Sequence, residues 1–183
     1  MESEEIANTY QIRRLAKGES ISAFDCGDAD LNDFILNEAI QYRQARLAVS
    51  YVIETKETRQ VVGFFSLAND RVSISDFENK TEFNRFRRKR FVNEKRLKSY
   101  PATKICRLGV DISVKGKSLG TFILDFIKSY FVIDNKTGCR FITVDAYKDA
   151  VPFYLKNSFL PLNQEIDGDH TRLLFYDLDE IEE

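Results

Sequence analysis

The chain has 183 residues, of which 43% are hydrophobic and 31% charged, and its formal net charge is −2. This length and composition predict one globular domain with a sizeable core and exclude an intrinsically disordered chain. The sequence has no apolar run long enough to span a membrane and opens on acidic residues rather than a secretory signal, so we expect a cytoplasmic protein. Three scattered cysteines and one histidine lack the spacing of a zinc site, so we expect no metal.

The charges are distributed unevenly along the chain. Residues 80–98 contain nine Lys or Arg and two acidic residues, whereas both ends of the chain are acidic. Segregated charge of this kind predicts a basic patch on an otherwise acidic protein.

The first half of the chain alternates strand and helix patterns. Residues 10–16 and 49–54 read as strands, and the polar segment TKETRQ then leads into a further strand at 61–68, which predicts a hairpin. Between the first two strands, Asp28 or Asp30 can cap a helix. The apolar positions of this helix repeat at helical spacing: Leu31, Phe34, Ile35, Ala39 and Tyr42.

The second half begins with a basic helical insertion at about 75–100, for which Phe83, Phe86 and Phe91 are the expected apolar anchors. Pro101 then precedes a strand at 103–111. The next helix is the clearest element, with one apolar stripe that we expect to be buried: Leu119, Phe122, Ile123, Phe126, Ile127, Tyr130 and Phe131. We expect it to stop near Asn135 or Gly138. A strand at 140–146, a helix at 150–157, a hairpin through 167–169 and a strand at 171–178 complete an α/β (α+β) domain with a mixed sheet.

The segment from Arg107 to Ile127 reads as strand, basic glycine-containing turn and helix. Backbone N–H groups at such a helix start can bind an anion without dedicated side chains. A P-loop is excluded because Asp111 stands where that motif needs a glycine, and no GxGxxG for a dinucleotide is present. An ordinary turn with solvated lysines is the alternative interpretation.

In this segment the chain resembles the GNAT superfamily of N-acetyltransferases, whose signature is Gln/Arg-x-x-Gly-x-Gly/Ala between the fourth strand and the following helix. Lys115, Ser118 and Gly120 occupy the signature positions, and Ser118 departs from the glycine. The sequence RLGVD resembles the family's strand beside the pantetheine arm, and VDAYKDAVPFYLKNSF resembles its closing segment.

The opening FDCGDADLNDFI and the Tyr100-Pro101 pair resemble the branch that includes acetyltransferase toxins of toxin–antitoxin systems. This resemblance covers roughly residues 10–177. It implies a single GNAT domain over residues 1–183. It also implies a mostly antiparallel sheet of six to seven strands, flanked by helices and splayed between strands 4 and 5.

The resemblance further implies acetyl-CoA as the cofactor, with the pyrophosphate on the turn and the pantetheine arm along the preceding strand. The residues that this assigns to the cofactor are Leu108, Gly109, Val110, Lys115, Gly116, Lys117, Ser118, Leu119, Gly120 and Thr121. Gly109 suits either a close ligand or tight packing against the strand.

For catalysis, the resemblance makes the N–H of Val110, or of a neighbour, the oxyanion donor and makes Tyr154 the proton donor to the departing thiolate. A tyrosine packed on the sheet is the alternative for Tyr154. Three residues at expected strand ends are candidate bases, Asn69, Asp70 and Asp145, and no spacing singles one out. His170 is expected to be a solvated loop residue.

The acceptor is sought in the basic insertion, where Arg87, Arg88 and Arg90 alternate with phenylalanines. Arginines attract phosphates and aromatic rings stack on bases, so nucleic acid is a candidate ligand. The toxin resemblance implies acetylation of the amino acid on a charged tRNA; a protein or peptide amine and a small amine are the other candidates. The segment also suits docking of an acidic partner or a second copy in a homodimer, and a non-catalytic module that binds CoA or RNA is the alternative function.

Overall fold

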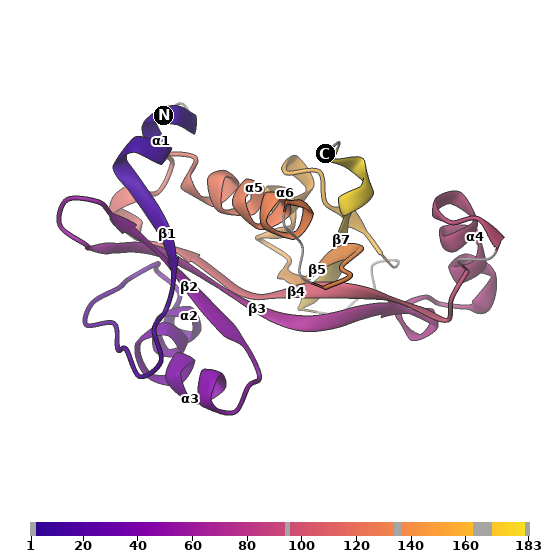
Figure 1. The fold of residues 1–183 in the computed structure, drawn as a ribbon, viewed down its shortest axis with the longest axis horizontal. Coiled ribbons are helices and arrows are strands. Elements are labelled where there is room, and N and C mark those ends of the chain that lie inside the picture. Colours follow the sequence, from indigo (N-terminus) through magenta and orange to yellow (C-terminus); the bar gives the residue numbers. More distant parts are fainter. Residues whose placement is uncertain (1–2, 94–95, 134–136, 163–169, 182–183) are drawn as a thin grey trace. The chain divides into compact units, whose positions relative to one another are not determined.

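The computed structural model describes residues 3–93, 96–133, 137–162 and 170–181 (Figure 1). The expected hairpin through 167–169 and Asn135 lie outside these residues. The helices are α1 (Ser3–Thr9), α2 (Ala29–Asp33), α3 (Ala39–Gln44), α4 (Lys80–Arg90), α5 (Leu119–Val132) and α6 (Val151–Lys156). The strands are β1 (Tyr10–Arg14), β2 (Val49–Thr55), β3 (Val61–Ser73), β4 (Ser99–Val110), β5 (Phe141–Tyr147), β6 (Leu160–Pro161) and β7 (Thr171–Asp177).

The strands form one seven-stranded sheet in the order β1-β2-β3-β4-β5-β7-β6. The pairs β1–β2, β2–β3, β5–β7 and β6–β7 are antiparallel, and β4–β5 is parallel. The parallel ladder covers only three residues of each strand, Ala102–Lys104 against Phe141–Thr143. The expected fold class, a mixed and mostly antiparallel sheet with flanking helices that splays at strands 4 and 5, is confirmed.

The described chain divides into two compact units, each built from separate segments. Unit 1 comprises residues 1–68 and 105–127, and unit 2 comprises residues 69–104 and 128–183. Because β3, β4 and α5 extend over both ranges, each of these elements contributes residues to both units.

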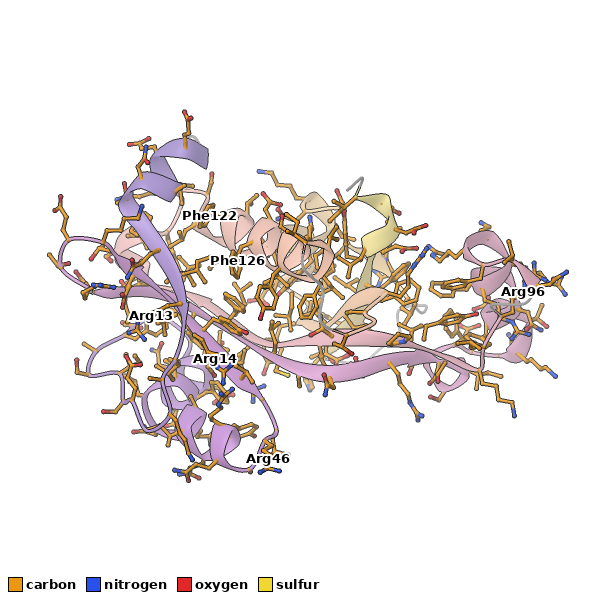
Figure 2. All side chains as sticks on the ribbon, in the orientation of Figure 1. Arg13, Arg14, Arg46, Arg96, Phe122 and Phe126 are labelled. Carbon is orange, nitrogen blue, oxygen red and sulfur yellow. The ribbon has the colours of Figure 1, made fainter. Side chains whose placement is uncertain are left out.

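In unit 1, helices lie on both faces of the strands (Figure 1). On one face Phe34 stacks on Phe64 of β3, with ring centroids 6.1 Å apart. On the other face Phe126 of α5, labelled in Figure 2, lies 6.0 Å from Phe65. Successive residues of β3 therefore serve opposite faces, as the two-residue period of a strand requires.

Unit 2 has a core of phenylalanines to which α4 contributes Phe83 and Phe86, both buried. Asn79 caps α4 by accepting from the N–H groups of Thr81 and Glu82. Phe91 stacks on Tyr100 at 4.0 Å, although it is only partly buried. The three anchors expected for the insertion therefore all pack against other aromatic rings.

Several elements differ from the sequence prediction. α1 and β6 were not expected, and a π-helical turn, η1 (Phe34–Glu38), joins α2 to α3 where one continuous helix was expected. β4 begins before Pro101 rather than after it, and its ladder to β5 starts at the next residue, Ala102.

The expected stripe of α5 is only partly right. Leu119, Ile123 and Ile127 are buried, but so is Leu124, whereas Tyr130 is exposed. Among the described residues no helix is long and apolar enough to cross a membrane.

Candidate functional site

The segment between β4 and α5 forms the anion loop, residues 111–118. It opens with a short 3₁₀ helix, η4 (Ile112–Val114), capped by Asp111, which accepts from the N–H of Ser113 at 2.9 Å. Two residues then take left-handed backbone conformations, Gly116 with φ of 80° and Ser118 with φ of 61°. Such residues turn neighbouring N–H groups toward a common point, which is the geometry of an anion-binding concavity.

Several N–H groups of this loop and of the helix start have no acceptor. The first bond of α5 is from Phe122 N to Ser118 O, at 3.1 Å. Within the part of the chain that the structure describes, the N–H groups that precede it donate to nothing: Gly116, Ser118, Leu119, Gly120 and Thr121. Gly116 and Ser118 are exposed, and with the positive end of a 14-residue helix these N–H groups can bind a phosphate group.

The backbone conformation of Ser118 bears on its departure from the GNAT signature. This residue stands in the place of a glycine and takes the left-handed conformation that glycine would supply. A non-glycine residue in this region costs about 1–2 kcal/mol. Serine therefore occupies at this position a backbone conformation that favours glycine.

The two lysines of the loop differ in their surroundings. Lys117 is exposed. Lys115 donates from Nζ to the carbonyl oxygen of Cys26 at 2.7 Å. Lys117 and the backbone are therefore better placed than Lys115 to meet a phosphate.

The end of β4 carries the residues expected beside the pantetheine arm. Leu108 and Val110 are half-buried and Gly109 is buried. A Cβ on Gly109 would lie 2.8 Å from Cε1 of Phe64, so no larger residue fits here. Tight packing is thus present at Gly109, against a side chain of β3, and a close ligand at this glycine stays a prediction.

Tyr154 belongs to unit 2, where it lies in α6 and is buried. Its ring meets the rings of Phe153 and Phe159 edge-on, at 5.1 and 5.4 Å. Burial raises the pKa of the Tyr154 phenol well above its usual range. A phenol keeps its proton at neutral pH even without this shift, and the raised pKa makes it a weaker acid, so the protonation state does not distinguish a proton donor from a packed tyrosine.

Two of the three candidate bases already have partners in unit 2. Asp70 accepts from the hydroxyl of Thr143, and Asp145 pairs with Lys104. Asn69 is exposed, as is His170, which confirms the expectation for the histidine. None of these contacts singles out a base.

The structure corrects the assignment of the basic insertion. Arg90 is not available to a ligand, because its Nε lies 3.0 Å from the buried carboxylate of Asp177 and its guanidinium lies over the ring of Phe86. Arg87 donates to the backbone oxygens of Arg96 and Leu97. Arg96, labelled in Figure 2, lies beside α4. Of the three expected arginines only Arg88 is exposed.

The sequence analysis predicted a basic patch over residues 80–98, but spacing alone does not separate solvated arginines from packed ones. The described cations of this segment that are exposed are Lys80, Arg85, Arg88, Lys89 and Lys98. These residues, rather than Arg87 and Arg90, form the basic surface of the insertion.

No family profile matches the sequence. Among solved structures, a tyrosine-to-phenylalanine mutant of KacT is 21% identical with a TM-score of 0.74, covering 94% of this chain and 96% of that one. AtaT complexed with acetyl-methionyl-tRNAfMet is 20% identical with a TM-score of 0.70, covering 93% and 96%. A bacterial toxin is 13% identical with a TM-score of 0.75, covering 93% and 92%.

These likenesses, together with the sheet order and the loop between β4 and α5, define the class: the chain has the GNAT fold. Within that class it is similar over nearly its whole length to KacT and to AtaT. AtaT is also known as a toxin bound to the C-terminus of the antitoxin AtaR and acetyl-CoA.

Proposed function

We propose that the protein is an N-acetyltransferase that transfers the acetyl group of acetyl-CoA to a primary amine by direct attack in a ternary complex. The observation that carries this proposal is the run of unpartnered N–H groups from Ser118 to Thr121 behind a loop with two left-handed residues. That arrangement suits a pyrophosphate, and it stands at the place where the GNAT signature falls. The GNAT fold and the acetyl-CoA complex of AtaT support the same cofactor.

In this proposal the cofactor supplies an activated acetyl thioester, and the chain binds and orients it. The backbone from Gly116 to Thr121 holds the phosphates, and Lys117 adds positive charge. The N–H of Val110 stabilises the negative charge that develops on the thioester oxygen. As the amine nitrogen forms a bond to the acetyl carbon, the carbon–sulfur bond breaks, the amine loses a proton to water, and Tyr154 donates a proton to the thiolate.

We propose the amino acid of a charged tRNA as the acceptor. The exposed cations of α4, among them Arg85, Arg88 and Lys89, provide the salt-dependent phosphate attraction that RNA requires. The complex of AtaT with acetyl-methionyl-tRNAfMet supports this class of acceptor.

The activity is tested by measuring thiol release from acetyl-CoA with a panel of charged tRNA, uncharged tRNA, peptides and polyamines, and by following labelled acetyl groups in cell extract with mass spectrometry. Release with charged tRNA alone supports the acceptor. Release with peptides alone moves the acceptor to protein amines, and binding of CoA without release from any acceptor establishes the non-catalytic module instead. That alternative stays open because no residue is singled out as the base, although the left-handed conformation of Ser118 supports a signature-like loop.

The RNA surface is tested by reversing charge at Arg88 and Lys89, which are exposed. The double variant Arg88→Glu/Lys89→Glu should weaken tRNA binding at least tenfold at low salt and lower its salt dependence. The matched control is Lys17→Glu/Lys156→Glu, which makes the same charge change at exposed lysines outside α4. Equal loss in the two variants would show that net charge, and not this surface, governs RNA binding.

A further inference from the structure

A turn near the start of the chain lies against the anion loop in unit 1. This turn, residues 24–28, is called the Asp25 turn. Its backbone accepts from the loop, because Ile112 N donates to Asp25 O at 2.9 Å. The backbone also donates to the loop, because Asp25 N meets Asp111 Oδ2 at 3.1 Å. Two hydrogen bonds of opposite direction thus join segments 86 residues apart in sequence.

Lys115 provides the third connection. Its Nζ donates to the carbonyl oxygen of Cys26 at 2.7 Å. Gly27 follows with φ of 80°, and a Cβ there would lie 3.5 Å from Nζ. The ammonium group is therefore held between the loop that carries it and the turn that accepts from it.

The Asp25 side chain holds the turn itself in shape. Its Oδ1 accepts from Gly27 N at 2.8 Å and from Asn32 Nδ2 at 2.8 Å. Asn32, in α2, completes a ring by accepting from Cys26 N at 2.9 Å. The hydrogen bond from Gly27 N, followed by that from Asn32, lowers the pKa of Asp25, so this carboxylate is ionised at neutral pH.

We propose that the Asp25 turn is a brace that holds the anion loop in its ligand-binding conformation. Asp25 and Lys115 are then positioning residues for the phosphates of CoA and do not touch them. This inference rests on the proposed function. Its physical basis is that Ser118 stays in a sparsely populated conformation only while the surroundings fix it. A loop without a brace would have to be ordered at the moment of binding, which weakens affinity.

Direct charge and bracing predict opposite signs for the removal of Asp25. If Asp25 acted on the phosphates only through its charge, Asp25→Ala would remove a repulsion and strengthen CoA binding. If Asp25 supports the brace, the same change removes two hydrogen bonds from the turn and weakens CoA binding despite the more favourable charge. Asp30→Ala is the matched control, because it removes the same charge from an exposed residue of α2.

The experiment measures the dissociation constants of CoA and of pantetheine, which has the same thiol arm without the phosphates, by calorimetry on the full chain. We expect Asp25→Ala to bind CoA roughly tenfold more weakly, the scale of one lost hydrogen bond, and to bind pantetheine as the unmodified protein does. Asp30→Ala should match the unmodified protein for both ligands. Tighter CoA binding by Asp25→Ala, or an equal loss for both ligands, overturns the brace.

Hydrogen exchange without ligand gives a second, independent measurement, read at the loop amides that are hydrogen-bonded: those of residues 112–115 and of Lys117. Asp25→Ala should raise the exchange of these amides and its control Asp30→Ala should not, although both remove one negative charge. Likewise Lys115→Met should raise it and Lys117→Met should not, although both remove one positive charge. Unchanged exchange in Asp25→Ala refutes the brace whether or not CoA binds. If the unmodified protein does not bind CoA but exchange responds as expected, the proposed function is wrong. The Asp25 turn then still holds the loop in shape, and the loop binds another anion.

Discussion

Replacing Ser118 by glycine should stabilise the protein, although serine-to-glycine changes usually destabilise. Ser118 has φ of 61°, a conformation that costs an L-residue about 1–2 kcal/mol and glycine almost nothing. Glycine gains about 0.5–1 kcal/mol of extra backbone entropy in the unfolded chain, which opposes this relief. The net expectation for Ser118→Gly is a free energy of unfolding higher by about 0.5 kcal/mol, from these two opposing terms.

The same helix offers a control with the opposite sign. Ser129 is an exposed residue inside α5, where its carbonyl accepts from Ile133 N at 2.8 Å. Glycine is less favourable than serine in a helix interior by about 0.5 kcal/mol, so Ser129→Gly should destabilise by that amount. The two variants should therefore differ by about 1 kcal/mol in urea unfolding, a difference well within reach of that measurement.

Calorimetric titration with CoA then measures whether the Ser118→Gly variant still binds the cofactor. Because glycine is the residue of the family signature, Ser118→Gly should retain the affinity. If Ser118→Gly lowers stability as much as Ser129→Gly does, the left-handed strain assigned to Ser118 is wrong. If stability rises but CoA affinity is lost, the serine hydroxyl contributes to binding and the backbone alone does not form the site.

Three further predictions concern packing, catalysis and pH. Gly109→Ala should lower the free energy of unfolding by about 1–3 kcal/mol in urea, because the new Cβ would meet Phe64 at 2.8 Å. Adding Phe64→Leu to this variant should recover part of the loss. Gly138→Ala is the control and should change nothing, because its Cβ would point into open space. Tyr154→Phe should preserve acetyl-CoA binding and lower the turnover of thiol release, and an unaltered kcat removes Tyr154 from the mechanism. In the unmodified protein, ionisation of this phenol should cause no loss of activity up to about pH 9, because burial raises the pKa of Tyr154. Stability should fall below about pH 4, because hydrogen bonds from Arg13 and from Gly27 hold the pKa values of Glu19 and Asp25, respectively, below their unfolded values. This stabilisation is complete above the unfolded pKa and is lost as the pH falls through the folded pKa. A thermal unfolding midpoint that stays constant from about pH 6 to 3 contradicts the assignment.

The fold was predictable because its main elements carry strong periodic signals. The α5 pattern and the β-strands around it are apolar at the right spacing, and Asp28 caps α2 as its position suggests. The π-helical turn after α2 had no such signal, since a wider turn changes the register of the helix without requiring a particular residue. The shift of the buried α5 face toward Leu124 likewise depends on what packs against the helix, which no single-helix pattern contains.

The sequence predicted the part of the candidate site that is formed by backbone N–H groups, but not the contacts of its side chains. The anion loop follows from the local sequence, but the use of Lys115 as a tie to Cys26 depends on a residue 89 positions away. The same limit applies to the insertion. Arg88 and Arg90 are equivalent in spacing, and only the buried partner Asp177 shows that Arg90 belongs to the packing of unit 2.

The attachment of α4 to the rest of unit 2 fixes the positions of its exposed cations. Asp177 is buried between Arg90 and Arg140, with Nε–O distances of 3.0 and 2.7 Å, so the helix is fastened at its C-terminal end as well as by its phenylalanines. A surface held in this way need not fold when it associates, unlike a disordered basic arm. Association should then be fast and governed by long-range attraction, with little of the heat-capacity change that accompanies coupled folding. If the exposed cations of α4 bind RNA as proposed, the RNA meets a surface that is already folded, and the positions of these charges decide which RNA fits.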